Sequence, residues 1–126
     1  MVHPITSEFL SLDKIQELIR ANATLELSKE SADKIVVCRV YLDEKIHRSE
    51  APIYGINTGF GSLCDTEIDK EDLSQLQWNL VTSHACGMGD EVPKEIVKLM
   101  ILLKVQGLSQ GHSGVQLITV QRLIDF

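Results

Sequence analysis

The stretch from Tyr54 to Gly61 (YGINTGFG) has the clearest potential for chemistry in this sequence of 126 residues. Its three glycines allow the backbone to adopt positive φ angles and allow other groups to approach closely. A phenol has an ordinary pKa of about 10, so it acts as a general base only with help from a cation, hydrogen-bond donors or a helix N-terminus. Tyr54 is therefore a candidate base on a shaped loop, and the alternative is a buried aromatic anchor for that loop.

His84 is the second candidate, in the segment Ser83–Gly87 (SHACG). We expect it in the last turn of a helix that ends before the glycine. There, a histidine can bind the free carbonyl groups of the helix end and interact favourably with the helix dipole. The imidazole can equally face a pocket and bind a substrate or exchange a proton with it. The sequence leaves both roles open.

The other polar residues and the cysteines give weaker indications of a functional role. Asn57 and Thr58 can donate hydrogen bonds to a substrate or build an Asx-type turn, which is the commoner use. His112 lies between two small residues before a helix and is expected to be a turn residue. Nothing near Cys64 or Cys86 would activate a thiol, so we expect both to be buried and inert.

Several familiar signatures are absent from the sequence. The loop glycines do not match GxGxxG and no GK[ST] follows them, so a nucleotide phosphate site is unsupported. The histidines lack HExxH or HxH spacing, so a metal site is unsupported as well. There is also no GxSxG nucleophile elbow. Tyr54 and His84 remain the main candidates, with both interpretations of each still open.

The elements that position these residues are expected to be helices. Ser11 and Ser28 each precede a helical apolar pattern, and each can cap the helix that follows it. The second pattern continues to Val40, and Pro52 ends any such helix. Residues 22–27 between the two helices are expected to be a connector with a brief extended piece.

Three further helices are expected after the glycine loop. Asp69 can cap the third, which carries His84 near its end. Pro93 is well placed as the first residue of the fourth, and Gly107 and Gly111 are expected to break that helix. Ser113, with a glutamine three residues on, matches a capping box that opens the last helix.

The last helical pattern continues to Phe126 without a glycine, a proline or a polar tail. Natural domains seldom finish in mid-pattern with an exposed apolar end. We therefore expect residues 1–126 to be a single N-terminal domain fragment of a longer protein, with exposed apolar patches that favour self-association.

Composition narrows the function classes. An apolar fraction of 44% is ordinary for a globular chain, and a net charge of −6 argues against a nucleic-acid or membrane partner. Three cysteines without a CxxC pair indicate a reducing compartment. The sequence has no signal peptide and no apolar stretch long enough to span a bilayer. These features predict a soluble, cytoplasmic protein.

Taken together, three blocks resemble the N-terminal part of the aromatic amino acid ammonia-lyase family. The blocks are Tyr54–Gly61 (YGINTGFG), Leu76–Gly89 (LQWNLVTSHACGMG) and Ser109–Val115 (SQGHSGV). Their order and separation fit the family, and the resemblance covers nearly the whole chain. It is closest to the histidine-specific members, which carry the Ser-His-Ala form at residues 83–85. The last block departs from the family at Gln110, where a basic residue is usual.

The resemblance implies a fold and an activity. The fold is expected to be mainly α: the N-terminal helical portion of the ammonia-lyase fold with a glycine-rich active-site loop, truncated before the central helical bundle. Members eliminate ammonia from an α-amino acid by means of a methylidene-imidazolone, an electrophile that forms when an internal Ala-Ser-Gly cyclises. They are homotetramers whose active sites combine residues of several subunits. This chain contains no Ala-Ser-Gly. The triad is expected beyond residue 126, and the fragment alone is expected to be inactive.

The resemblance also implies roles for individual residues. Tyr54 matches the loop tyrosine that acts as the base, or assists it, in removing the β-proton. His84 matches a histidine that faces the substrate and helps select its side chain. Asn57 and Gly61 are expected to bind substrate, and no residue of this chain is expected to bind a metal or cofactor. The implied reaction converts L-histidine into trans-urocanate in histidine catabolism.

Two alternatives remain open from the sequence. The first keeps the family but makes the protein a tyrosine or phenylalanine lyase, or an aminomutase that returns the amine to the β-carbon. His84 disfavours phenylalanine, but nothing in the sequence separates a lyase from a mutase. The second is a stand-alone helical interaction domain, and the apolar C-terminal end argues against it.

Overall fold

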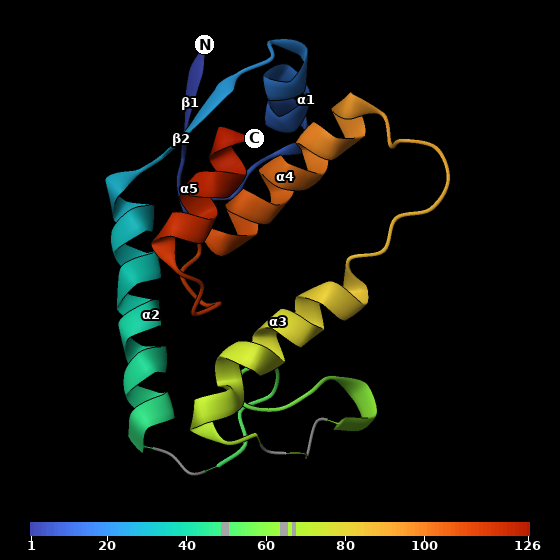
Figure 1. Ribbon diagram of the computed structural model, residues 1–126. Coiled ribbons are helices and arrows are strands. Elements are labelled where there is room, and N and C mark those ends of the chain that lie inside the picture. The colour runs from blue at the N-terminus through green and yellow to red at the C-terminus, as the bar shows by residue number, and fades with distance from the viewer. Residues whose placement is uncertain (49–50, 64–65, 67) are drawn as a thin grey trace. The chain divides into compact units, whose positions relative to one another are not determined.

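The computed structural model describes residues 1–48, 51–63, 66 and 68–126. It divides into two compact units, Met1–Arg48 with Glu91–Phe126 and the intervening Ser49–Asp90. The elements are mostly helices, and the expected mainly α fold is confirmed (Figure 1). The expectation of a single domain stays a prediction. Cys64 lies outside the described residues.

The elements of the first unit are β1 (Val2–Ile5), α1 (Leu12–Arg20), β2 (Thr24–Leu27), α2 (Lys29–Arg48), α4 (Lys94–Leu108) and α5 (Leu117–Asp125). The elements of the second unit are two short 3₁₀ turns, η1 (Gly61–Leu63) and η2 (Lys70–Asp72), followed by α3 (Leu73–His84). Within the described residues, no helix combines the length and apolar character needed to cross a bilayer.

A two-stranded parallel sheet begins the first unit, with α1 as the connection between its strands. Val2 pairs with Thr24, and the register continues to Ile5 opposite Leu27. The extended piece expected within residues 22–27 is therefore β2. The strand β1 was not expected, because its four residues contain Pro4 and show no clear alternation. Pairing with β2, which lies more than 20 residues away in the sequence, is what makes β1 a strand.

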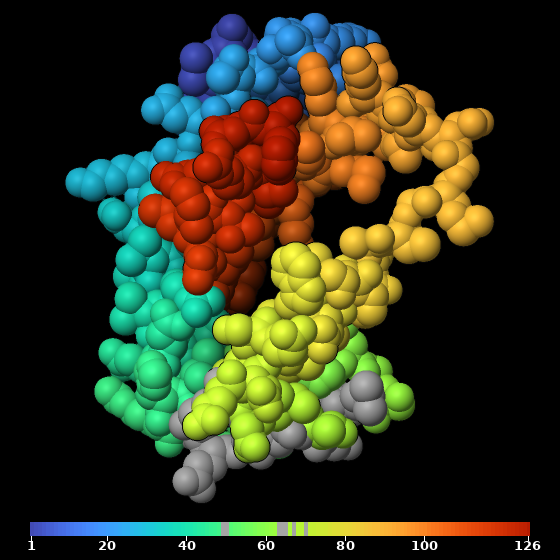
Figure 2. Space-filling view, in the orientation of Figure 1, coloured from blue at the N-terminus to red at the C-terminus, as the bar shows by residue number. Residues whose placement is uncertain are grey.

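The core of the first unit is built from three side chains of α4 and one each of β1, α1, α2 and α5. The buried apolar residues are Ile5, Leu18, Ile35, Leu102, Val105, Leu108 and Val120. α5 packs against α4, α2 and β2 (Figure 1). The space-filling view shows the residues of α5 (red) against those of α4 (orange; Figure 2). Each fully buried aliphatic side chain contributes roughly 1.5–3 kcal/mol relative to an exposed one.

Two of the expected helix caps are confirmed. The Ser11 hydroxyl accepts a hydrogen bond from the Lys14 N–H at 3.2 Å, and the Ser28 hydroxyl accepts one from the Ser31 N–H at 3.2 Å. Pro93 is the N-cap of α4 without a side-chain cap bond, so the helix begins at Lys94, one residue later than expected. The caps made by Ser11 and Ser28 are local, because donor and acceptor are three residues apart in the sequence.

The two other caps were predicted wrongly. Asp69 makes no side-chain cap bond, because the turn η2 intervenes before α3 begins. α5 begins four residues after Ser113 without a side-chain cap bond. The cause is a turn around Gly114, whose N–H donates to the Cys38 sulfur at 3.3 Å and whose carbonyl accepts from the Arg39 guanidinium at 3.3 Å. These bonds hold the turn against α2, so the helix starts later.

Glycines 107 and 111 behave differently from one another. Gly107 does not break its helix, since α4 continues to Leu108; the burial of Val105 and Leu108 outweighs the cost of about 1 kcal/mol for a helical glycine. Gly111 has a φ of +73°, and a Cβ there would lie 2.7 Å from the Lys34 Cβ and 2.9 Å from the Lys34 carbonyl carbon. The turn after α4 therefore packs directly on the backbone of α2.

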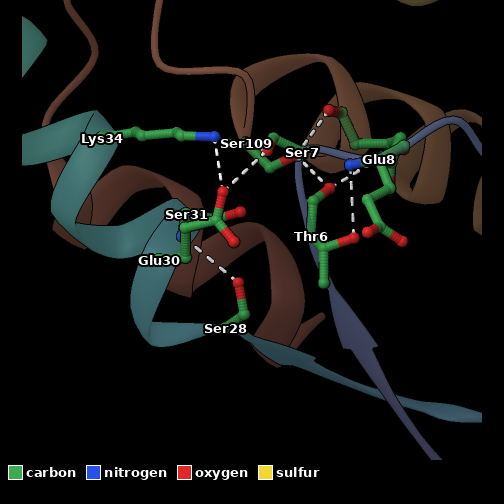
Figure 3. Close-up of polar contacts among 9 residues, drawn as sticks. Thr6, Ser7, Glu8, Ser28, Glu30, Ser31, Lys34 and Ser109 are labelled. Atoms are coloured by element: carbon green, nitrogen blue, oxygen red, sulfur yellow. Dashed lines mark hydrogen bonds and ion pairs between the residues drawn. The ribbon is translucent and has the colours of Figure 1, made fainter.

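A polar cluster holds the segment that follows β1 (Figure 3). The Lys34 ammonium donates to the Ser7 hydroxyl and to the Glu30 carboxylate, both at 2.6 Å, and Ser7 donates to Glu30 at 3.2 Å. The Ser109 hydroxyl donates to the Thr6 carbonyl at 3.0 Å. Hydrogen bonds from Lys34 and then from Ser7 lower the pKa of Glu30 below its ordinary 4.5. Residues 6 and 7 are thus tied to both α2 and α4.

Replacing Gly111 by alanine should destabilise the chain. We expect Gly111→Ala to lower the free energy of unfolding by about 2–4 kcal/mol, because it adds backbone strain at positive φ and overpacks against Lys34. Gly107→Ala is the matched control: a Cβ at that position has no neighbour within 4 Å, so it should gain about 0.5–1 kcal/mol. Urea unfolding followed by circular dichroism measures both, and equal midpoints would contradict the packing argument.

The Glu30 cluster should make stability depend on pH. Because the folded pKa is depressed, its contribution is fully present above the unfolded pKa and is lost as the pH falls through the folded pKa. Glu30→Gln should therefore lower the thermal midpoint at pH 7, and the difference from the parent chain should shrink at pH 3. Glu26→Gln, at an exposed position on β2, is the control. A Glu30→Gln difference that is the same at both pH values would refute the argument.

Candidate functional site

The second unit is organised by a tight turn at the start of the glycine-rich loop. The N–H groups of Ile56 and Asn57 donate to the Ile53 carbonyl at 3.0 and 3.2 Å. In return, the Asn57 side-chain oxygen accepts from the Ile53 N–H at 2.6 Å. The Thr58 hydroxyl is buried, accepts from the Gly55 N–H at 3.2 Å and donates to the Gly59 carbonyl. Both side chains therefore help to build the turn, and a role for Asn57 in binding substrate stays a prediction.

Three rings lie in a row across this unit. The centroids of Tyr54 and Phe60 are 5.8 Å apart at an interplanar angle of 51°. Phe60 and His84 are also 5.8 Å apart, in an edge-to-face arrangement at 83°. The structure therefore brings the two main candidates together, with Phe60 between them. The Tyr54 side chain is 64% exposed, so in this chain it is not the buried anchor of the alternative interpretation.

Gly55 makes the row possible. Its φ is +70°, and a Cβ there would lie 2.9 Å from the Phe60 Cε1. Gly61 also has a positive φ, +57°, but a Cβ there would have no neighbour within 4 Å. The first glycine is thus needed for both conformation and space, and the second for conformation alone. A role for Gly61 in binding substrate stays a prediction.

His84 ends α3, and one of its ring nitrogens is occupied. Its Nδ1 lies 2.8 Å from the Leu80 carbonyl oxygen and 3.1 Å from the Ser83 hydroxyl. A carbonyl oxygen only accepts, so Nδ1 carries the hydrogen and donates it. In the neutral ring, Nε2 is then a bare acceptor. Of the two roles left open by the sequence, the structure shows Nδ1 bound to the helix end. The binding of a substrate by His84 stays a prediction.

Sequence reasoning missed a contact made by Gln77. Its side-chain amide nitrogen donates to the carbonyls of Gly55 and Ile56, both at 3.2 Å. The signal was its place in the apolar stripe of α3, where Gln77 is a polar residue among leucines and valine. A polar side chain on a face that packs usually has a specific partner.

The remaining candidates lie away from this turn. His112 lies in the connection between α4 and α5, as expected of a turn residue. Cys86 is exposed, so the expectation of a buried thiol is wrong at that position, which follows α3 where the chain has left the helix. In the described ranges, no group of three or more histidine, cysteine or acidic side chains could hold a metal ion.

Comparison with known proteins places these features in a family context. Residues 10–126 match the family model described as aromatic amino acid lyase. Histidine ammonia-lyase of Deinococcus radiodurans is 43% identical over 115 residues, which is 91% of this chain and 22% of that protein. Histidine ammonia-lyase of Natranaerobius thermophilus is 39% identical over 99% of this chain and 24% of its own length.

Solved structures of related proteins are also similar to this chain. Histidine ammonia-lyase from Trypanosoma cruzi superimposes with a TM-score of 0.80 at 34% identity, over 98% of this chain and 23% of that one. Tyrosine aminomutase from Streptomyces globisporus gives a TM-score of 0.87 at 29% identity, over 99% of this chain and 24% of that one. This chain therefore spans about a quarter of the length of these relatives.

Replacing Gly55 should separate the three rings. In Gly55→Ala the new methyl group displaces Phe60, so nuclear Overhauser contacts from Phe60 to Tyr54 and His84 should weaken or vanish. Gly61→Ala is the matched control, because it adds the same strain at positive φ without the contact. Ring contacts that survive in Gly55→Ala would show that Phe60 does not depend on the missing side chain.

Proposed function

Because this chain belongs to the aromatic amino acid lyase family, we propose that it is the N-terminal part of a histidine ammonia-lyase. The longer protein eliminates ammonia from L-histidine and releases trans-urocanate in histidine catabolism. It works in the cytoplasm as a homotetramer whose sites combine residues of several subunits. The 126-residue chain alone is inactive.

The observation that carries this proposal is the row of Tyr54, Phe60 and His84 in one compact unit. The reaction must remove a weakly acidic β-proton and break a C–N bond, so it needs both a base and an electron sink. In this proposal Tyr54 is the base. Its exposed phenol, at the start of a turn that holds its neighbours, can reach a ligand on the surface of the unit.

The electron sink comes from outside these residues. The family's methylidene-imidazolone supplies it when formed from Ala-Ser-Gly. Residues 1–126 contain no such triad, so nothing in this chain can form the group. The described residues hold and orient the substrate and take its proton.

His84 selects the substrate side chain in this proposal. With Nδ1 donating to the Leu80 carbonyl, the bare Nε2 accepts an N–H from the substrate imidazole. A phenyl ring offers no such donor, so L-phenylalanine would leave this acceptor unpaired. The phenol of L-tyrosine does offer a donor. Selection between histidine and tyrosine must therefore also depend on shape and on groups outside this chain.

A second candidate is a tyrosine aminomutase. The resemblance in structure to the Streptomyces globisporus enzyme favours it, as does the hydrogen-bonding capacity of a tyrosine side chain toward His84. The higher sequence identity to relatives named as histidine ammonia-lyases favours the first candidate.

The longer protein should convert L-histidine into urocanate and should form no cinnamate from L-phenylalanine, and ultraviolet absorbance detects both products. Tyr54→Phe should lower kcat at least about 100-fold, because it removes the general base. Tyr41→Phe, at an exposed position on α2, should leave kcat unchanged. A β-amino acid product from L-tyrosine would support the second candidate, and full activity in Tyr54→Phe would remove Tyr54 from the base role.

A further inference from the structure

We propose that Gln77 is a positioning residue that holds the Tyr54 loop on α3 and so sets the phenol relative to the His84 imidazole. The catalytic meaning of this inference rests on the proposed function. The positioning itself does not, because all the residues involved lie in one compact unit of this chain.

The contact is made to the two residues that directly follow Tyr54. The amide nitrogen of Gln77 lies 3.2 Å from the carbonyl oxygen of Gly55 and 3.2 Å from that of Ile56. An amide NH₂ has two hydrogens, so it can serve both carbonyls at once. Among the described residues of α3, Gln77 is the one whose side chain donates hydrogen bonds to this loop.

The turn itself supplies the other half of the arrangement. The N–H groups of residues 55, 56 and 57 all donate within the turn, to the Thr58 hydroxyl or to the Ile53 carbonyl. These bonds shape the turn but cannot attach it to the helix. The carbonyls of Gly55 and Ile56 provide that attachment by accepting hydrogen bonds from the Gln77 amide.

Helix geometry connects this attachment to His84. Gln77 and His84 are seven residues apart, so they lie on one face of α3, about 10 Å apart along the axis. Phe60 of the same loop contacts the His84 ring, and its centroid also lies 5.8 Å from that of Tyr54. The loop is therefore held on this face at two points, by the Gln77 amide near its start and by the Phe60–His84 contact near its end.

The contact with the two carbonyls requires a hydrogen-bond donor, which the Gln77 amide supplies. A carboxylate of the same size cannot donate a hydrogen bond, and it would place negative oxygens against two carbonyl oxygens. Gln77→Glu is thus a nearly isosteric test. The matched control is Gln75→Glu on the same helix, because the Gln75 amide donates to the Asn79 side chain at 2.8 Å and does not contact the loop.

Hydrogen exchange on the 126-residue chain tests the positioning. Gln77→Glu should lower the protection factors of the Ile56 and Asn57 amides about fivefold to tenfold at pH 7, as expected for losing exposed hydrogen bonds. Near pH 4 the introduced carboxyl becomes protonated and regains one donor, so part of the protection should return. Gln75→Glu should change neither value. Unchanged protection in Gln77→Glu would overturn the proposal.

Kinetics of the longer protein test the catalytic consequence. Gln77→Glu should lower kcat for L-histidine about 100-fold with little change in KM, because a displaced phenol misses the proton it must take. The kinetic isotope effect with L-histidine deuterated at the β-carbon should rise as proton removal becomes slower than other steps. Gln75→Glu should change neither quantity.

The exchange and kinetic experiments distinguish a failure of the role proposed for Gln77 from a failure of the proposed function. Lowered protection with an unchanged kcat and isotope effect, in an enzyme that acts on L-histidine, would overturn the catalytic role of Gln77. A parent enzyme that does not act on L-histidine would overturn the proposed function instead. In that case, the exchange data on the 126-residue chain still decide whether Gln77 holds the loop.

Discussion

Both units of this chain depend on one constraint, the close approach of a turn to a neighbouring group at a position where no side chain fits. In the first unit, the turn at Gly111 packs on the backbone of α2. In the second, Gly55 admits the edge of Phe60. Each contact requires both positive φ and the missing Cβ. The packing of α2 on the connection before α5, and the row of rings at the proposed site, follow from these two glycines.

Local features of the fold were readable from the sequence. Ser11 and Ser28 cap their helices as expected, since a cap needs only residues three positions apart. The wrong predictions concern elements whose structure is fixed by residues far away in the sequence. β1 is a strand because β2 pairs with it, and the helix after Ser113 starts late because α2 holds the preceding turn. Gly107 stays helical because α4 packs well on both sides of it.

At the candidate site too, some features were predictable from the sequence and others depend on contacts between distant residues. Tyr54 and His84 were identified by residue type and local context, and the structure places them on either side of Phe60. The hydrogen on Nδ1 of His84 was not predictable, because it follows from the orientation of the ring toward the Leu80 carbonyl. Gln77 was missed because the carbonyls it contacts are more than 20 residues away in sequence.

Among the residues that the structure describes, the buried apolar core lies in the first unit, whereas the residues proposed to act on the substrate lie in the second. Substitutions that reshape the row of rings therefore leave the volume of that core unchanged. Mutations in enzymes usually trade stability against activity, because the same packed residues serve both. In this chain, stability depends on the core of the first unit, whereas the proposed activity depends on residues of the second unit. Substrate preference can thus diverge between relatives, from histidine to tyrosine, while the supporting scaffold evolves at its own rate.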